Sequence, residues 1–178
     1  MNEAASIDLN HIASGATVRA FSLALRQPGN EPIDRKNYAM KIKDLMHSGV
    51  AVHSQDTPIS MIAKTMKEHD VGAVPITDSN KLVGMVTDRD IVLKATTDGA
   101  DWSKLTAKDV MTKDVATCQE GDSIHHAAHL METRNVRRLP VLDHGKNVVG
   151  MVSLGDMSHG APQDVATKLM RAVSAHHV

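Results

Sequence analysis

Two stretches of the chain carry apolar residues at the spacing that places them on one face of an α-helix. They are Ile59, Ile62, Ala63 and Met66 in the first half, and Ile124, Ala127, Ala128 and Met131 in the second. The first stretch follows Asp56, Thr57 and Pro58, and a polar capping side chain followed by proline is typical of a helix start. Asp122 or Ser123 is placed to cap the second. We therefore predict one such helix in each half.

Each predicted helix is followed by two apolar runs rich in β-branched residues, which favour strands. The four runs cover residues 71–77, 82–87, 136–142 and 148–153. Polar turns at 78–81 and 143–146 separate them, so an antiparallel hairpin is predicted in each half. A short first strand is predicted in each half, at 50–52 and at 115–117. A second helix is predicted to follow each hairpin, beginning near Asp88 and near Gly155.

The second half repeats the first. At an offset of 65 residues Lys43-Asp44-x-Met46 recurs as Lys108-Asp109-x-Met111, and after one inserted residue Val83-Gly84-Met85-Val86 recurs as Val149-Gly150-Met151-Val152. A unit of roughly 55 residues buries little surface by itself, so we expect the two copies to share a core. The duplication divides the chain into an extension at 1–39, a first repeat at 40–97, a linker at 98–105, a second repeat at 106–160 and a helical tail at 161–178.

The extension carries one further helical signal. Val18, Phe21 and Leu25 lie at positions i, i+3 and i+7, which favours a short amphipathic helix that ends at Pro28 and Gly29. We expect the extension to dock on the core or on a partner chain.

Composition and charge exclude several classes of protein. The 178 residues are 42% hydrophobic and 23% charged, an ordinary balance for a folded globular chain. Aromatic residues make up only 2%, which excludes the base-stacking surfaces of proteins that bind single strands. A net charge of −1 excludes general attraction to DNA or to anionic membranes. One cysteine, Cys118, cannot form an internal disulfide, which fits a reducing compartment such as the cytoplasm.

Established catalytic motifs are missing from the sequence, since GxxxxGK[ST], HExxH and GxSxG do not occur. We therefore expect neither enzymatic activity nor a catalytic cofactor. His125 and His129 have the spacing of two metal ligands on a helix. They align with Ser60 and Lys64, off the apolar stripe of the first helix, so a solvated histidine face is expected instead of a metal site.

Both halves end in the motif Gly-x-x-Thr/Ser-x-x-Asp, and two such units strongly resemble tandem CBS domains (cystathionine β-synthase type repeats). The resemblance covers residues 40–160 and rests on KDLM, VGAVPITD and LVGMVTDRDIV in the first copy and on KDVMTKDVAT, NVRRLPVLD and VVGMVSLGDM in the second. It implies an α+β fold in which two β-α-β-β-α repeats pack through their sheets with pseudo-twofold symmetry. It also implies homodimers, and clefts between the repeats that bind AMP, ADP or ATP, or in some members NAD or S-adenosylmethionine.

The resemblance further implies where such a ligand binds. Asp90 and Asp156 are suited to accept hydrogen bonds from ribose hydroxyls, and Thr87 and Ser153, three residues upstream, are suited to contact ribose or phosphate. Adenine is expected against Val50, Ala51, Val52, Val115, Ala116 and Thr117, with walls from Val71, Val74, Val136 and Leu139.

The two copies differ in their positive charges. Arg137 and Arg138 stand where the first copy has Gly72 and Ala73, and Arg89 stands where the second has Gly155. Phosphate requires cations, and the resemblance implies that an arginine at this position can serve phosphate bound chiefly by the other repeat. We therefore favour the cleft that contains Thr87 and Asp90, with Arg138 reaching across to it. Gly84 and Gly150 lack a Cβ and permit close approach of a backbone. Two structural roles stay open: Thr-x-x-Asp is also a good helix cap, and the arginine pair is also suited to surface ion pairs.

The sequence thus predicts an adenine-nucleotide sensor that signals energy or stress state through a change of shape or of partner. The expected partners are the adenosine-containing ligand, a second copy of the chain and an unidentified protein target, with neither DNA nor a membrane. The alternative is a stress-associated dimeric interaction protein in which one or both clefts are vestigial. The residues name neither the particular ligand nor the target.

Overall fold

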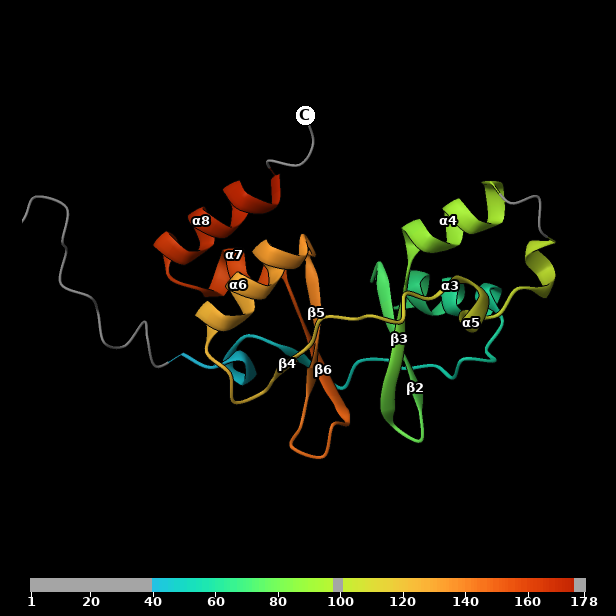
Figure 1. Cartoon of the computed structure of the whole chain (residues 1–178), viewed down its shortest axis with the longest axis horizontal. Helices are drawn as coiled ribbons and strands as arrows, with labels where there is room; N and C mark the ends of the chain where they lie inside the picture. Colours follow the sequence, from blue (N-terminus) through green and yellow to red (C-terminus); the bar gives the residue numbers. More distant parts are fainter. Residues whose placement is uncertain (1–39, 98–100, 175–178) are drawn as a thin grey trace, which may run out of the picture. The chain divides into compact units, whose positions relative to one another are not determined.

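Two sheets with helices packed on them make up the part of the chain that the computed structural model describes, residues 40–97 and 101–174 (Figure 1). The helix expected at 18–25 lies outside these residues. The mixture of helices and strands confirms the α+β class. In the described ranges, no helix is both long and apolar enough to cross a membrane.

The two repeats share a helix, an antiparallel hairpin and a second helix in the same order. The first begins with the 3-10 helix η1 (Ile42–Asp44) and β1 (His47–Ser48) and continues with α3 (Ile59–Glu68), β2 (Ala73–Asp78), β3 (Lys81–Thr87) and α4 (Asp88–Thr97). The second contains β4 (Cys118–Gln119), α6 (Ile124–Arg134), β5 (Arg138–Leu142), β6 (Val148–Ser153) and α7 (Leu154–Gly160). α5 (Ala107–Val110) stands at the start of this repeat, η2 (Trp102–Lys104) lies in the linker before it, and α8 (Gln163–Ser174) follows it.

Both predicted hairpins are confirmed. β2 pairs antiparallel with β3, and β5 pairs antiparallel with β6. In the first turn Ser79 and Asn80 have φ angles of 48° and 63°, the left-handed conformation typical of a two-residue hairpin turn. The hairpins bring Thr87 and Ser153, at the ends of β3 and β6, directly to the starts of α4 and α7.

The short first strand of each repeat lies later than predicted. In the second repeat it is β4 rather than residues 115–117, and it runs parallel to β5 with Cys118 facing Val141. In the first repeat His53, not residues 50–52, makes a single parallel bridge to Ile76. The prediction was wrong because pairing begins only where the chain enters the core. Cys118 is 3% exposed, whereas residues 115–117 are half-buried.

Both helices begin where predicted, but the predicted side-chain cap is present only in the second repeat. Ser123 caps α6, and its hydroxyl accepts a hydrogen bond from His126 N at 3.2 Å. α3 receives no side-chain cap from residues 56–58. Its first amide, Ile59 N, instead donates to Leu105 O at 3.0 Å, so backbone from ahead of the second repeat satisfies it.

The segment at the start of each repeat packs on the sheet of the other repeat. β1 pairs antiparallel with β6, with His47 facing Met151, so one sheet has the order β1-β6-β5-β4. In the equivalent place on the other sheet, Thr112 and Met85 exchange two backbone hydrogen bonds, each of 2.9 Å. The sheet of each repeat is therefore completed by residues from the start of the other repeat, which the sequence did not predict.

Each sheet and its helices enclose an aliphatic core. The first core contains Ile59, Ile62, Met66, Val74, Ile76, Val86, Ala107 and Val110. The second contains Ile42, Cys118, Ile124, Ala127, Met131, Leu139, Val141, Val152 and Met157, joined by Val165, Leu169 and Val173 of α8. The predicted helix faces are confirmed except at Ala63, which is exposed. We call residues 42–48 and 107–112 the exchanged segments, because each packs on the other repeat. Ile42 lies in the core of the second repeat and Ala107 in the core of the first, so each core includes a residue that the other repeat supplies.

Candidate functional site

Each hairpin runs into its following helix through a capped turn. Asp90 Oδ2 accepts hydrogen bonds from Thr87 N at 2.9 Å and Thr87 Oγ1 at 2.6 Å, and Asp90 N donates to Thr87 Oγ1 at 3.1 Å. Ser153 and Asp156 repeat this arrangement with distances of 2.7, 2.7 and 3.2 Å. The capping role that the sequence left open is thus present in both copies. It occupies one carboxylate oxygen of each aspartate.

A cleft of about 670 Å³ lies beside the Asp90 turn and is lined by residues of both repeats. Eight predicted site residues line it: Thr87, Arg89 and Asp90 from the first repeat and Val115, Ala116, Val136, Arg137 and Arg138 from the second. Six further residues line it that were not predicted as site residues: Met85, Asp88, Thr112, Asp114, Asn135 and Val173. The structure therefore brings the Asp90 turn together with the arginine pair of the other copy.

Arg138 comes close to the first repeat at Gly72. A Cβ at position 72 would lie 3.3 Å from Arg138 Nη2 and 2.9 Å from Asp88 Oδ2. A side chain there would crowd the guanidinium group and displace the carboxylate. The glycine of one copy thus leaves room for the arginine of the other.

The remaining predicted residues lie elsewhere. Val50, Ala51, Val52, Val71, Thr117, Ser153 and Asp156 are outside the lining of this cleft. Val74 and Leu139 belong to the two cores, with 1% and 0% of their surface exposed. In this structure both side chains are buried, and their expected contact with adenine stays a prediction.

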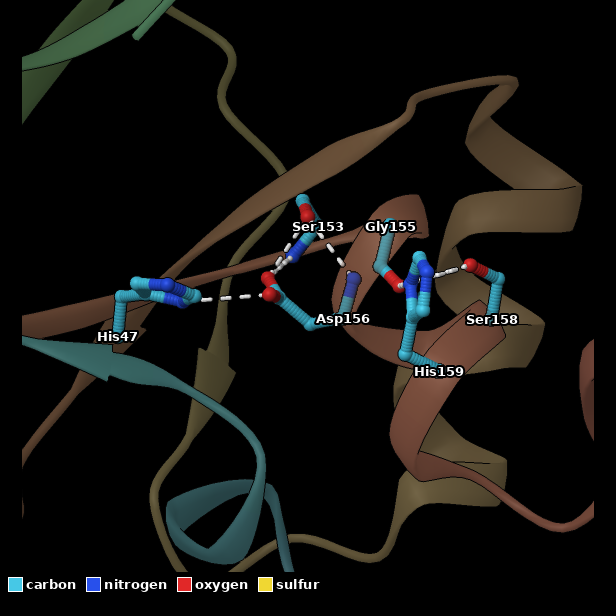
Figure 2. Close-up of polar contacts among 6 residues, drawn as sticks. All are labelled: His47, Ser153, Gly155, Asp156, Ser158 and His159. Atoms are coloured by element: carbon cyan, nitrogen blue, oxygen red, sulfur yellow. Dashed lines mark hydrogen bonds and ion pairs between the residues drawn. The ribbon is translucent and has the colours of Figure 1, made fainter. Parts of the chain in front are cut away.

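The second turn carries a contact that the first lacks. Asp156 Oδ1 lies 3.2 Å from His47 Nδ1, on an imidazole presented by β1 (Figure 2). The residue equivalent to His47 in the other copy is Thr112, and among the residues that the structure describes no side chain makes such a contact with Asp90 Oδ1. Side chains and backbone of residues 40–97 and 101–174 therefore engage both oxygens of Asp156 but only one oxygen of Asp90.

Gly84 and Gly150 admit backbone of this chain rather than a ligand. A Cβ at Gly150 would lie 2.7 Å from His47 O, and a Cβ at Gly84 would lie 3.0 Å from Thr112 O. The close approach inferred from the sequence is present. Its cause is the pair of exchanged segments that run beside β6 and β3.

Metal-binding side chains do not gather in the described ranges. Within residues 40–97 and 101–174, no group of three or more His, Cys, Asp or Glu side chains is placed to hold a metal ion. His125 and His129 both lie on α6, where the first is half-buried and the second is exposed.

The sequence profile of the CBS domain matches residues 42–95 and again residues 107–160, which together make up more than half of the chain. The chain belongs to the CBS domain family. The CBS domain-containing protein YhcV of Bacillus subtilis is 38% identical over 117 residues, which are 66% of this chain and 82% of that protein. Hypoxic response protein 1 of Mycobacterium tuberculosis is 33% identical over 132 residues, which are 74% of this chain and 92% of that protein.

A solved CBS pair also superposes on the chain. The CBS domain pair of protein MJ0100, in complex with 5′-methylthioadenosine and S-adenosyl-L-methionine, has a TM-score of 0.62 and 30% identity. The match covers 67% of this chain and 94% of that one. Together with the family match, it confirms the tandem CBS architecture inferred from the repeated motifs.

Enzymes also occur among the relatives. Homoserine O-acetyltransferase of Methanocorpusculum labreanum is 33% identical over 120 residues, but the chain covers only 24% of that enzyme. A match to so small a part of the enzyme gives no reason to infer acetyltransferase activity for this CBS pair.

Proposed function

We propose that the chain is a regulatory module that binds an adenosine-containing ligand in the Asp90 cleft. The observation that carries the proposal is the composition of this cleft. It joins the Thr87–Asp90 turn of one repeat with aliphatic and arginine side chains of the other. The complex of MJ0100 with two adenosine-containing compounds supports the class of ligand.

Each part of a nucleotide has a group suited to it in the cleft. The carboxylate oxygen of Asp90 that does not take part in the cap, Oδ1, is suited to accept hydrogen bonds from ribose hydroxyls. Val115, Ala116 and Val136 are half-buried aliphatic side chains suited to contact the faces of adenine. The three arginines are suited to phosphate. We therefore propose AMP, ADP and ATP first, with NAD and S-adenosylmethionine as further candidates.

The charges around the cleft rank these ligands. Asp88, Asp90 and Asp114 oppose the three arginines, so the lining has no net positive charge at neutral pH. Each added phosphate meets repulsion from the carboxylates as well as attraction to the guanidinium groups. We therefore expect AMP to bind more tightly than ATP.

One ligand per chain is expected, because His47 already engages Asp156 and because Gly155 stands where the first copy has Arg89. Signalling in this proposal is a shift between two conformations or association states that differ in ligand affinity. The output passes through a homodimer or an unidentified protein target, in the cytoplasm.

Isothermal titration calorimetry with AMP, ADP, ATP, NAD, S-adenosylmethionine and 5′-methylthioadenosine tests the proposal. Asp90→Ala and Asp156→Ala remove the same cap from equivalent turns, so each is expected to cost about 1 kcal/mol of stability. Only Asp90→Ala should weaken ligand binding, by about tenfold or more, because hydrogen bonds to a charged group contribute about 1.5–3 kcal/mol. If no compound binds to the wild type, or if both variants bind equally well, the proposal is wrong.

A second candidate function is a dimeric interaction protein of the stress response, with one or both clefts vestigial. Its support is the similarity to hypoxic response protein 1 and the exposure of Met61, Val92 and Leu93 on α3 and α4. Exposed apolar side chains on neighbouring helices are suited to a protein partner. A wild-type chain that binds none of the six compounds but forms a stable dimer would favour this function.

A further inference from the structure

Arg138 is a half-buried cation that lines the Asp90 cleft. Within the part of the chain that the structure describes, no carboxylate forms an ion pair with it. A charge that is partly removed from water and has no partner costs free energy, which an anion bound beside it would offset. Arg89 and Arg137 line the same cleft but are exposed. Of the three arginines, Arg138 is therefore the one that an anionic ligand group would stabilise most.

Gly72 of the first repeat determines how much room this guanidinium group has. A Cβ at position 72 would lie 3.3 Å from Arg138 Nη2 and 2.9 Å from Asp88 Oδ2. Both atoms are the ends of side chains, so a methyl group at this position would displace them more readily than it would displace backbone. Gly72 does not have the positive φ that favours glycine, so alanine is compatible with its backbone. A side chain at position 72 would therefore change the cleft with little effect on the fold.

The duplication makes the two copies unequal at this place. Gly72 is equivalent to Arg137, and Ala73 is equivalent to Arg138. Ala73 is 5% exposed, so the first repeat has a buried small residue where the second has its half-buried cation. Any side chain at position 72, an arginine included, would place its Cβ against the guanidinium group of the other copy. One copy therefore supplies the cation, and the other supplies the space for it.

We propose that Gly72 is a specificity-determining position: because it has no side chain, the Arg138 guanidinium group enters the Asp90 cleft, and the cleft selects ligands that carry a phosphate. The inference rests on the proposed function, since it assigns phosphate recognition in the same cleft to one pair of residues. Gly72 is a positioning residue, because it acts through Arg138 and is not among the residues that line the cleft.

The test compares Gly72→Ala, Arg138→Gln and the double variant in isothermal titration calorimetry. The probes are AMP and 5′-methylthioadenosine, which carries a methylthio group in place of the phosphate. Gly72→Ala should raise the Kd for AMP by about three- to tenfold, and Arg138→Gln should raise it by about tenfold or more, the loss expected for a hydrogen bond to a charged group. Both should leave the Kd for 5′-methylthioadenosine within about twofold of the wild type. The double variant should bind AMP no more weakly than Arg138→Gln, because two changes that act through one group are not additive.

Gly121→Ala is the matched control, because a Cβ at that position would have no atom within 4 Å. It should leave the Kd for both probes within about twofold of the wild type. The melting temperatures of Gly72→Ala and Gly121→Ala should both stay within about 3 °C of the wild type. Gly72→Val is a second variant with a larger side chain, and it should weaken AMP binding more than Gly72→Ala does.

The outcomes separate the two proposals. A wild type that binds neither probe overturns the proposed function and this inference with it. A wild type that binds 5′-methylthioadenosine but not AMP overturns the selection of phosphate and keeps the adenosine site. If Gly72→Ala and Gly72→Val bind AMP as tightly as the wild type, the role of Gly72 alone is wrong. Equal losses for the two probes, or a further loss when Gly72→Ala is added to Arg138→Gln, would show that Gly72 does not act through Arg138.

Discussion

Asp90 and Asp156 have the same cap but different neighbours, and one side chain makes the difference. β1 places His47 at 3.2 Å from the second oxygen of Asp156. The His47 side chain is 74% exposed, so water screens the pair and its contribution to stability is about 0–1 kcal/mol. The contact matters more for access of a ligand to Asp156, because a ribose hydroxyl that bound Oδ1 would have to replace the imidazole there. A difference in ligand occupancy between the two turns can thus arise from a single exchanged strand.

Cys118 gives the molecule a dependence on alkaline pH. Burial raises the pKa of its thiol from 9.0 to about 12, and the negative charge of Asp122 adds to the effect. Between these two values the unfolded chain loses the thiol proton while the folded chain keeps it. The unfolded state then binds fewer protons, so stability falls as pH rises through this window, by up to about 1.4 kcal/mol per pH unit.

We predict that Cys118→Ala removes this part of the alkaline loss of stability. Urea unfolding measured at intervals from about pH 8 to pH 11 tests the prediction, since the window begins near the ordinary thiol pKa. The other titrating groups are the same in both proteins, so the wild type is the control for the variant. A variant whose stability falls as steeply as that of the wild type would show that the thiol is not responsible.

At the level of elements, the exchanged segments hold the two repeats together. β1 extends the sheet of the second repeat, and α5 contributes Ala107, with 0% exposure, to the core of the first. Neither repeat therefore contains all of its own core. Glycines mark the two places where the exchanged backbone passes: Gly150 beside β1 and Gly84 beside Thr112.

We predict that Gly150→Ala destabilises the protein by about 1–3 kcal/mol. Its Cβ would lie 2.7 Å from His47 O, a backbone atom that can move only with β1. Gly84→Ala should cost less, because the nearest atom to its Cβ, Met111 Sδ at 2.6 Å, belongs to a flexible side chain. Urea unfolding measures both.

Gly121→Ala is the control for these variants, because a Cβ at Gly121 would have no atom within 4 Å. Its stability should stay within about 0.5 kcal/mol of the wild type. Equal stabilities for Gly150→Ala and Gly121→Ala would contradict the close passage of β1 beside β6.

For the molecule as a whole, the two repeats present different helical surfaces. On α3 and α4 the side chains of Met61, Val92 and Leu93 are 57%, 58% and 44% exposed. In the second repeat α8 packs on the corresponding helices, α6 and α7. If the proposed homodimer forms through apolar helical surface, the first repeat is the better placed to supply it.

We predict that Leu93→Glu weakens the dimer at least about tenfold, because a charge buried in an apolar interface without a partner is costly. Met170→Glu on α8 is the matched control, since Met170 and Leu93 are large apolar side chains with 42% and 44% exposure. Analytical ultracentrifugation over a range of concentrations measures both variants. A monomeric wild type, or an equal loss in the two variants, would contradict the prediction.

Local signals in the sequence determined the order of elements and the duplication. The hairpins, the helix faces and the Thr87–Asp90 cap follow from periodicity, turn residues and capping side chains, which act over a few neighbouring positions. The repeated motif also predicted that the Asp90 turn and Arg138 would meet in one cleft, because charge differed between the copies at a position that the family resemblance placed near phosphate.

The tertiary structure alone decided which segment completes which sheet, because no local pattern encodes pairing between distant residues. That pairing put His47 beside Asp156, and the packing of the helices turned Val74 and Leu139 into core. It also carried Val173 of α8 to the cleft. The amphipathic spacing of α8 indicates that one face of the helix is buried. Only its packing on α6 and α7 determines which residues that face contacts. The sequence therefore determined which capped turns and arginines the candidate site contains, and long-range contacts determined which other residues lie beside them.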